Sequence, residues 1–108
     1  MYCTKSALKA LNNNKKACLE IIELLKIETP KYRTQLETAD YNIKTVREII
    51  HGMIGAFHYT GAESVKAQLI ETQNICKDAK SDHKHAINIL INNLKSLEDY
   101  LNNNKIEF

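Results

Sequence analysis

The stretch REIIHGMIGAFHYTGAE, residues 47–63, says most about the fold. Its apolar residues recur at steps of three and four, which is typical of the buried face of a helix. With the residues just before it, the stripe is Ile43, Val46, Ile50, Met53 and Phe57. The same helix contains Gly52 and Gly55, and a glycine inside a helix costs about 1 kcal/mol relative to alanine. We therefore expect an amphipathic helix that gives up stability beside His51.

Three further segments carry the same helical stripe. They lie at residues 18–39, 62–76 and 87–101, with a shorter amphipathic piece at 6–11 and polar breaks at 12–14, 39–42 and 80–82. One proline, three glycines and no alternation of period two argue against strands. Long helices joined by short loops run antiparallel to their neighbours. The sequence predicts an all-α, antiparallel up-down-up-down four-helix bundle with a short N-terminal helix over one end, as a single domain spanning 1–108.

Several residues predict where helices bend or begin. Pro30 lies inside the first long stripe and should kink that helix or mark a bend. Thr60 and Glu63 have the spacing of a capping box, in which Thr60 would cap the next helix and Glu63 would reach back to the Thr60 amide. Ser81 or Asp82 is expected to cap the last helix.

Composition limits the class of protein. The chain has 108 residues, 44% hydrophobic and 26% charged, which is typical of a soluble globular protein. No apolar run is long enough to span a bilayer, so any membrane contact would need parts outside this segment, which could be cut from a longer protein. The net charge of +2 and the scattered basic residues argue against nucleic acid. We expect a cytoplasmic monomer.

The three cysteines do not form a disulfide framework. Cys3, Cys18 and Cys76 are odd in number and widely spaced, and no C-x-x-C pair occurs. Cys18 and Cys76 fall at apolar helical positions, so they are expected to be small core residues in a reducing setting.

His51 is expected to face water. At about 100° per residue, it lies roughly 120° from the centre of the apolar stripe. Its face is shared by Lys44, Arg47, Glu48, Gly55 and His58. Gly55, four residues on, would bare the helix surface beside the imidazole. For Gly52, close helix packing explains the glycine equally well.

An exposed imidazole can bind a metal, transfer protons or accept a phosphoryl group. His51 and His58 are about 10 Å apart along the helix axis, too far to chelate one ion. His83 and His85 point to different sides of a helix, and the inward glutamates of metal-binding bundles are missing. Acid–base catalysis needs a pocket, and the packed stripes predict no obvious cleft. Nucleophilic capture of phosphorus needs only a neutral, accessible ring nitrogen, which nearby positive charges favour.

The sequence IIHGMIGAFHYTGAESVKAQLIETQ resembles the signature of histidine-containing phosphotransfer (HPt) domains, H-x-x-[KR]-G-x-x-x-x-x-G-[AVL]. The matching residues are His51, Gly55, Gly61 and Ala62. The run Tyr59–Thr60–Gly61 is similar to the C-terminal HPt domain of hybrid sensor histidine kinases of the BarA/GacS type. The likeness spans most of the chain, because the preceding helix with its internal proline also matches.

The resemblance implies a phosphorelay intermediate between receiver domains rather than an enzyme with its own turnover. His51 would be the phosphoacceptor, and Gly55 would leave its approach open. Gln73 stands at the position of a family glutamine that hydrogen-bonds the imidazole and orients it. Response-regulator receiver domains would be donor and acceptor, and they would supply the Mg²⁺, so the chain needs no cofactor or metal of its own.

One position departs from the family pattern. Ile54 stands where the family usually has Lys or Arg, which helps to hold the phosphate. Lys44, Arg47 or His58 could substitute for that cation. A surface of Ile54, Gly55 and His58, flanked by the first long helix, would form the docking face. The alternative is a phosphate-independent helical interaction module, a degenerate HPt domain.

Overall fold

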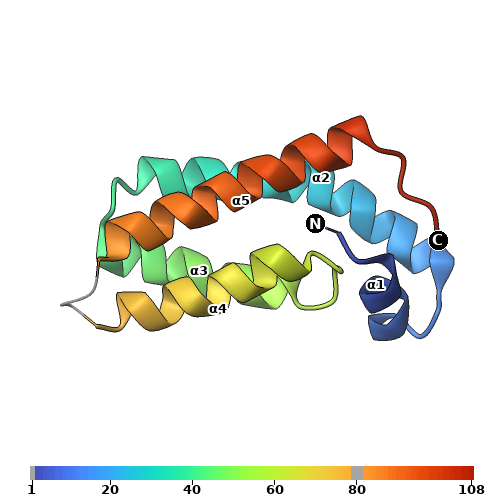
Figure 1. The fold of residues 1–108 in the computed structure, drawn as a ribbon, viewed down its shortest axis with the longest axis horizontal. Coiled ribbons are helices and arrows are strands. Elements are labelled where there is room, and N and C mark those ends of the chain that lie inside the picture. The colour runs from blue at the N-terminus through green and yellow to red at the C-terminus, as the bar shows by residue number, and fades with distance from the viewer. Residues whose placement is uncertain (1, 79–81) are drawn as a thin grey trace.

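The chain folds into five α-helices, as seen in a computed structural model that describes residues 2–78 and 82–108 (Figure 1). The helices are α1 (Thr4–Ala10), α2 (Lys15–Thr38), α3 (Ile43–Phe57), α4 (Glu63–Cys76) and α5 (His83–Asn103). No strand occurs in the described residues. The prediction of an all-α protein with four long helices and a short leading one is confirmed.

The long helices form a helical bundle around one hydrophobic cluster. Each of the pairs α2–α3, α3–α4, α4–α5 and α2–α5 is in contact. The predicted stripes supply the core, with half-buried Tyr32, Ala39 and Ile43 at its edge. The largest fully buried side chains are Phe57, Leu36, Ile50, Met53, Leu69, Ile87, Leu90, Leu94, Leu97, Leu101, Val46 and Val65. Burial of such side chains contributes about 1.5–3 kcal/mol each, which is the main force that holds the helices together.

Short polar side chains begin the helices. Asn14, Asn42 and Asp82 each cap a helix by accepting the backbone N–H three residues on. The Asp82 cap was predicted, whereas Ser81 lies outside the described residues. The turn at 39–42 is also confirmed: Asp40 and Tyr41 adopt left-handed φ angles of 47° and 61° there.

The helix α2 continues through Pro30 as one element, and the kink or bend expected at that residue stays a prediction. The capping box is wrong: α4 begins after Ala62 with no side-chain cap. Thr60 instead donates its hydroxyl to the Phe57 carbonyl at 2.9 Å and accepts the Ala62 N–H at 3.3 Å. The hydroxyl therefore bonds within the turn between α3 and α4 and accepts no N–H from the first turn of α4.

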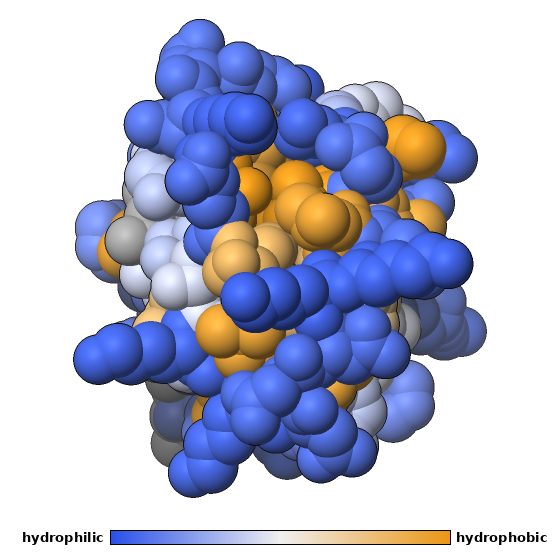
Figure 2. All heavy atoms as spheres, turned by 90° about the vertical axis from the view of Figure 1, so that its right-hand side faces the viewer, coloured by the Kyte–Doolittle hydropathy of each residue, from blue (hydrophilic) through white to orange (hydrophobic). Residues whose placement is uncertain are grey.

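The N-terminal segment packs onto the turn between α3 and α4. The Cys3 N–H donates to the Gly61 carbonyl at 2.8 Å. Gly61 has φ +83°, and a Cβ on it would lie 2.7 Å from the Cys3 carbonyl oxygen and 3.0 Å from the Ala7 Cβ. Tyr2 meets Phe108 edge to face, with ring centroids 6.4 Å apart. Figure 2 views this end of the molecule, where apolar atoms gather at the centre of a hydrophilic rim.

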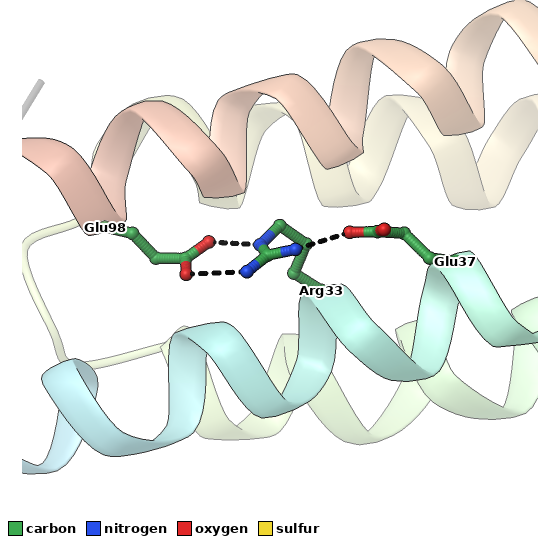
Figure 3. Close-up of polar contacts among 3 residues, drawn as sticks. All are labelled: Arg33, Glu37 and Glu98. Atoms are coloured by element: carbon green, nitrogen blue, oxygen red, sulfur yellow. Dashed lines mark hydrogen bonds and ion pairs between the residues drawn. The ribbon is translucent and has the colours of Figure 1, made fainter.

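One charged cluster ties α2 to α5. The guanidinium of Arg33 donates from Nε and Nη2 to both carboxylate oxygens of Glu98, and from Nη1 to Glu37 at 2.6 Å (Figure 3). The Glu98 side chain is only 15% exposed, so water screens this pair poorly. The hydrogen bonds that Arg33 donates to Glu98 and, with a smaller effect, to Glu37 raise the pKa of Arg33 above its usual value.

The cysteines follow the sequence prediction. Cys18 and Cys76 are buried and Cys3 is partly buried, and all three are free thiols. Burial raises the pKa of Cys18. Cys3 instead accepts from the Ser6 side chain and backbone N–H, and these bonds lower its pKa.

Candidate functional site

His51 lies on the solvent-facing side of α3, as the helical geometry predicts. Ile50, one residue before it, and Met53, two residues after it, are completely buried and fix the rotation of the helix. The imidazole is consequently exposed. A ring nitrogen on such a surface can be reached by a reacting group on another protein without any opening of the fold.

Both glycines beside His51 face open space. A Cβ added to Gly52 or to Gly55 would meet no heavy atom within 4 Å outside its own helix. The prediction that Gly55 clears the surface beside the imidazole is consistent with this. The close-packing interpretation of Gly52 is wrong, because no neighbouring helix approaches it. The two glycines together leave a bare strip of helix next to the ring.

His51 also lines an open depression of about 560 Å³ between α3 and α4. Its lining is Ile43, Lys44, Arg47, Glu48, His51, Gln73 and Lys77. The sequence predicted no obvious cleft, and this expectation is wrong. The reason is that the side chains around His51 are long and polar and stand out from the helices, so they enclose space above the packed core.

Residues on the two helices are matched in spacing. Arg47 and His51 are four residues apart on α3, and Gln73 and Lys77 are four residues apart at the end of α4. Residues four apart share a helix face. Because all four line one depression, the first half of α3 lies against the last turn of α4. Among the side chains of this surface, each helix therefore has one pair that lies one turn apart.

Positive charge dominates the depression. Lys44, Arg47 and Lys77 form no ion pair with any carboxylate among the described residues, and Glu48 is the one acidic side chain in the lining. Lys77 caps the C-terminal end of α4, where the helix dipole favours a cation. The site is thus suited to an anion.

The positive charge of Arg47 influences the pKa of a thiol on α4. Burial raises the pKa of the Cys76 thiol, and the positive charge of Arg47 opposes that shift. Cys76 is the last residue of α4 and adjoins Lys77. Arg47 lines the same depression as Gln73 and Lys77, which agrees with this influence on the end of α4.

Gln73 is half-buried in the same depression as His51. Within the described part of the chain, no hydrogen bond joins its amide to the imidazole. Its location fits an orienting role, and that role stays a prediction.

The other predicted site residues lie outside this depression. His58 is exposed and its ring stacks edge-on against Tyr59, with centroids 4.4 Å apart. Gly55 is exposed, while Ile54 is half-buried and packs against the core. The sequence-predicted set thus divides in two. Lys44, Arg47 and Gln73 gather with His51, whereas the expected docking residues follow it along α3.

An apolar surface borders α3 on its other side. A narrow crevice of about 30 Å³ runs between α2 and α3, lined by residues that include Leu24, Tyr32 and Ala56. Leu24 and Ile27 on α2 are 51% and 55% exposed. Large apolar side chains that are exposed near one another are typical of a surface that binds another protein, because binding removes them from water.

Sequence reasoning missed Lys77 as a site residue. Its signal was available, since Lys77 follows Gln73 by one helical turn and so shares its face. In the described segments, no group of three or more His, Cys, Asp or Glu side chains could hold a metal ion. No described helix has the length and apolar content needed to cross a bilayer.

Comparison with known proteins gives no match: no family model, no curated protein and no solved structure resembles the chain significantly. The features that characterise the site are the exposed His51 and the cation-lined depression around it.

Proposed function

We propose that the chain is a phosphorelay intermediate in which His51 carries a phosphoryl group between receiver domains. One observation carries the proposal. An exposed histidine, with bare helix on one side of it, lies in a depression lined by three cations that pair with no carboxylate in the part of the chain that the structure describes. An imidazole in such surroundings can attack an electrophilic phosphorus and hold the product.

The transfer step needs only the ring and a partner. The lone pair of one ring nitrogen of His51 attacks the phosphorus of an aspartyl phosphate on the receiver. The N–P bond forms as the O–P bond breaks, and the electron pair of the broken bond remains on the aspartate oxygen. During the attack the other ring nitrogen keeps its hydrogen, and the ring becomes positively charged. Release of that proton to water afterwards leaves the phosphorylated ring neutral. The reverse step delivers the phosphoryl group to the next receiver.

The other residues of the chain would orient the imidazole and bind the receiver, and they would not themselves catalyse the transfer. Gln73 would orient the ring so that the free nitrogen, Nε2, faces the partner. The partner receiver would supply Mg²⁺ and its own positive groups, since phosphoryl transfer depends mainly on positioning and charge stabilisation. Exposed Gly55 and His58, half-buried Ile54 and the apolar flank of α2 would form the docking face.

The proposal includes the helix arrangement. We infer that α2 to α5 run alternately up and down as an antiparallel four-helix bundle. The closed ring of contacting pairs and the short 58–62 connection between α3 and α4 support this. In such a bundle His51 projects from the middle of one helix, away from both ends, where a globular partner can approach it.

The test is transfer from a phosphorylated receiver domain of the same organism. We expect acid-labile, alkali-stable label on the wild type and none on His51→Gln. His85→Gln is a matched control, because that histidine is also exposed but lies on α5. Failure of every cognate receiver to label the folded wild type would contradict the proposal.

A second candidate function is a phosphate-independent interaction module. The observation that favours it is Ile54, which packs half-buried where the resembling family usually has a cation. Such a module would bind a receiver equally well as wild type and as His51→Gln, and would take no label. Measuring binding and labelling on the same pair of proteins separates the two functions.

A further inference from the structure

Arg47 and Lys77 line the same depression as the ring that would carry the phosphoryl group. Arg47 precedes His51 by four residues on α3, so the two side chains share one face of that helix. Lys77 reaches the same depression from α4, one turn beyond Gln73.

We propose that Arg47 and Lys77 bind the oxygens of the phosphoryl group on His51, and so replace from two helices the cation that Ile54 does not provide. This inference rests on the proposed function. Arg47 presents a planar fork of N–H donors suited to two oxygens, and Lys77 adds a compact charge. Ile54 follows His51 by three residues, so a cation there would reach the ring from the opposite side along α3.

The availability of both side chains supports the assignment. Neither has a carboxylate partner among the described residues, whereas Lys66 on α4 pairs with Glu63 at 3.6 Å. Arg47 also lies close enough to the end of α4 to act on the Cys76 thiol. A phosphoryl group entering the depression would therefore meet two cations that need not first leave another partner. Glu48, on the same surface, lowers the net positive charge of the lining.

The experiment labels the protein without a receiver. Phosphoramidate phosphorylates accessible histidines, and phosphorus NMR follows the titration of each phosphoryl group. His51→Gln assigns the His51 signal, and any signal from exposed His58 or His85 serves as an internal reference outside the depression. The variants are Arg47→Gln, Lys77→Gln and their combination. Lys16→Gln is the matched control, because Lys16 is exposed in the first turn of α2, does not line the depression and pairs with no carboxylate of the described residues. Figure 1 shows that the start of α2 lies at the opposite end of the bundle from the end of α4.

We expect the phosphoryl group on His51 to lose its last proton at a lower pH than the references, since nearby cations stabilise the dianion. The midpoint should rise toward the reference value in each variant and most in the double variant, and should not move in Lys16→Gln. Adding Ile54→Lys to the double variant should lower it again. With a receiver present, the equilibrium share of label on His51 should fall by about three- to tenfold in each single variant, as expected for the net contribution of one typical hydrogen bond.

Two results would overturn the inference. One is a His51 midpoint equal to that of the references in the wild type, or unmoved in the double variant. The other is absence of label on His51 while His58 or His85 takes it, which would mean that the depression excludes the anion. Failure of the proposed function gives a different pattern: the cations shift the midpoint as expected, but no receiver transfers to His51.

Discussion

The two arginines of the chain differ in their surroundings, and the difference separates structure from function. Arg33 on α2 is held by Glu98 and Glu37, and its donors are turned into the contact between α2 and α5. Arg47 on α3 has no carboxylate partner in the described residues and lines the depression of His51. A paired guanidinium joins two helices, whereas an unpaired one beside a depression remains available for an anion.

Two glycines show the same contrast between an enclosed position and an open one. Gly61 is enclosed by the N-terminal segment and has a positive φ, so any side chain there is strained and crowded. Gly55 faces open space on α3 and has a helical backbone. One glycine is required by the fold, and the other leaves the surface bare at a small cost in helix stability. The closed features hold the bundle together, and the open ones surround His51.

The largest effect should come from filling the enclosed glycine. Gly61→Ala places a Cβ 2.7 Å from the Cys3 carbonyl and forces a left-handed φ on an L-residue. Overpacking and the unfavourable φ together should lower the free energy of unfolding by about 3 kcal/mol. Urea denaturation measures the change. Wild-type stability in Gly61→Ala would mean that the N-terminal segment does not pack on this turn.

A smaller loss should follow removal of the paired arginine. Arg33→Ala leaves Glu98 mostly buried without its partner, so we expect a loss of about 2 kcal/mol and a fall in Tm of about 10 °C. Arg47→Ala should change stability by less than about 0.5 kcal/mol. Lys31→Ala, which removes an exposed pair with Glu28, should also have little effect. Equal losses at Arg33 and Arg47 would break the contrast between them.

The sequence predicted the helices well because their cores are periodic. Stripes such as Ile50, Met53 and Phe57 fixed both the helix and its rotation, and the exposure of His51 followed. The error at Thr60 arose because its hydroxyl oxygen accepts the Ala62 N–H inside the turn and not an N–H from the first turn of α4. Local spacing alone does not decide between such partners.

The site was predictable only in part. Lys44, Arg47 and Gln73 were named from the sequence, and all three line the depression with His51. The depression itself and Lys77 were missed, since both depend on how the end of α4 lies against α3. Positions of long polar side chains between two helices follow from tertiary packing, which periodicity within one helix does not contain.

The open glycine should respond in the opposite direction to Gly61. Gly55→Ala adds a methyl that touches nothing, so it should raise the free energy of unfolding by about 0.5 kcal/mol through helix propensity. The same methyl narrows the approach to His51 and should slow transfer from a receiver severalfold. Gly52→Ala is the matched control and should give similar stabilisation with a smaller effect on transfer. Equal transfer in both variants and wild type would show that the bare surface has no role in docking.

The smallest expected effect is a change in the pKa of Cys76, which tests whether the guanidinium of Arg47 lies near the end of α4. Burial raises the pKa of Cys76 and Arg47 opposes the shift, so Arg47→Gln should raise that pKa further. A raised thiol pKa stabilises the fold below the thiol's unfolded pKa, and this contribution is lost as pH rises through the folded value. Carbon NMR of labelled Cys76, in a background with Cys3→Ser and Cys18→Ser, follows the titration, with Lys16→Gln as control. An unmoved midpoint in Arg47→Gln would place the guanidinium away from α4, and the two arginines would then differ only in having or lacking a partner.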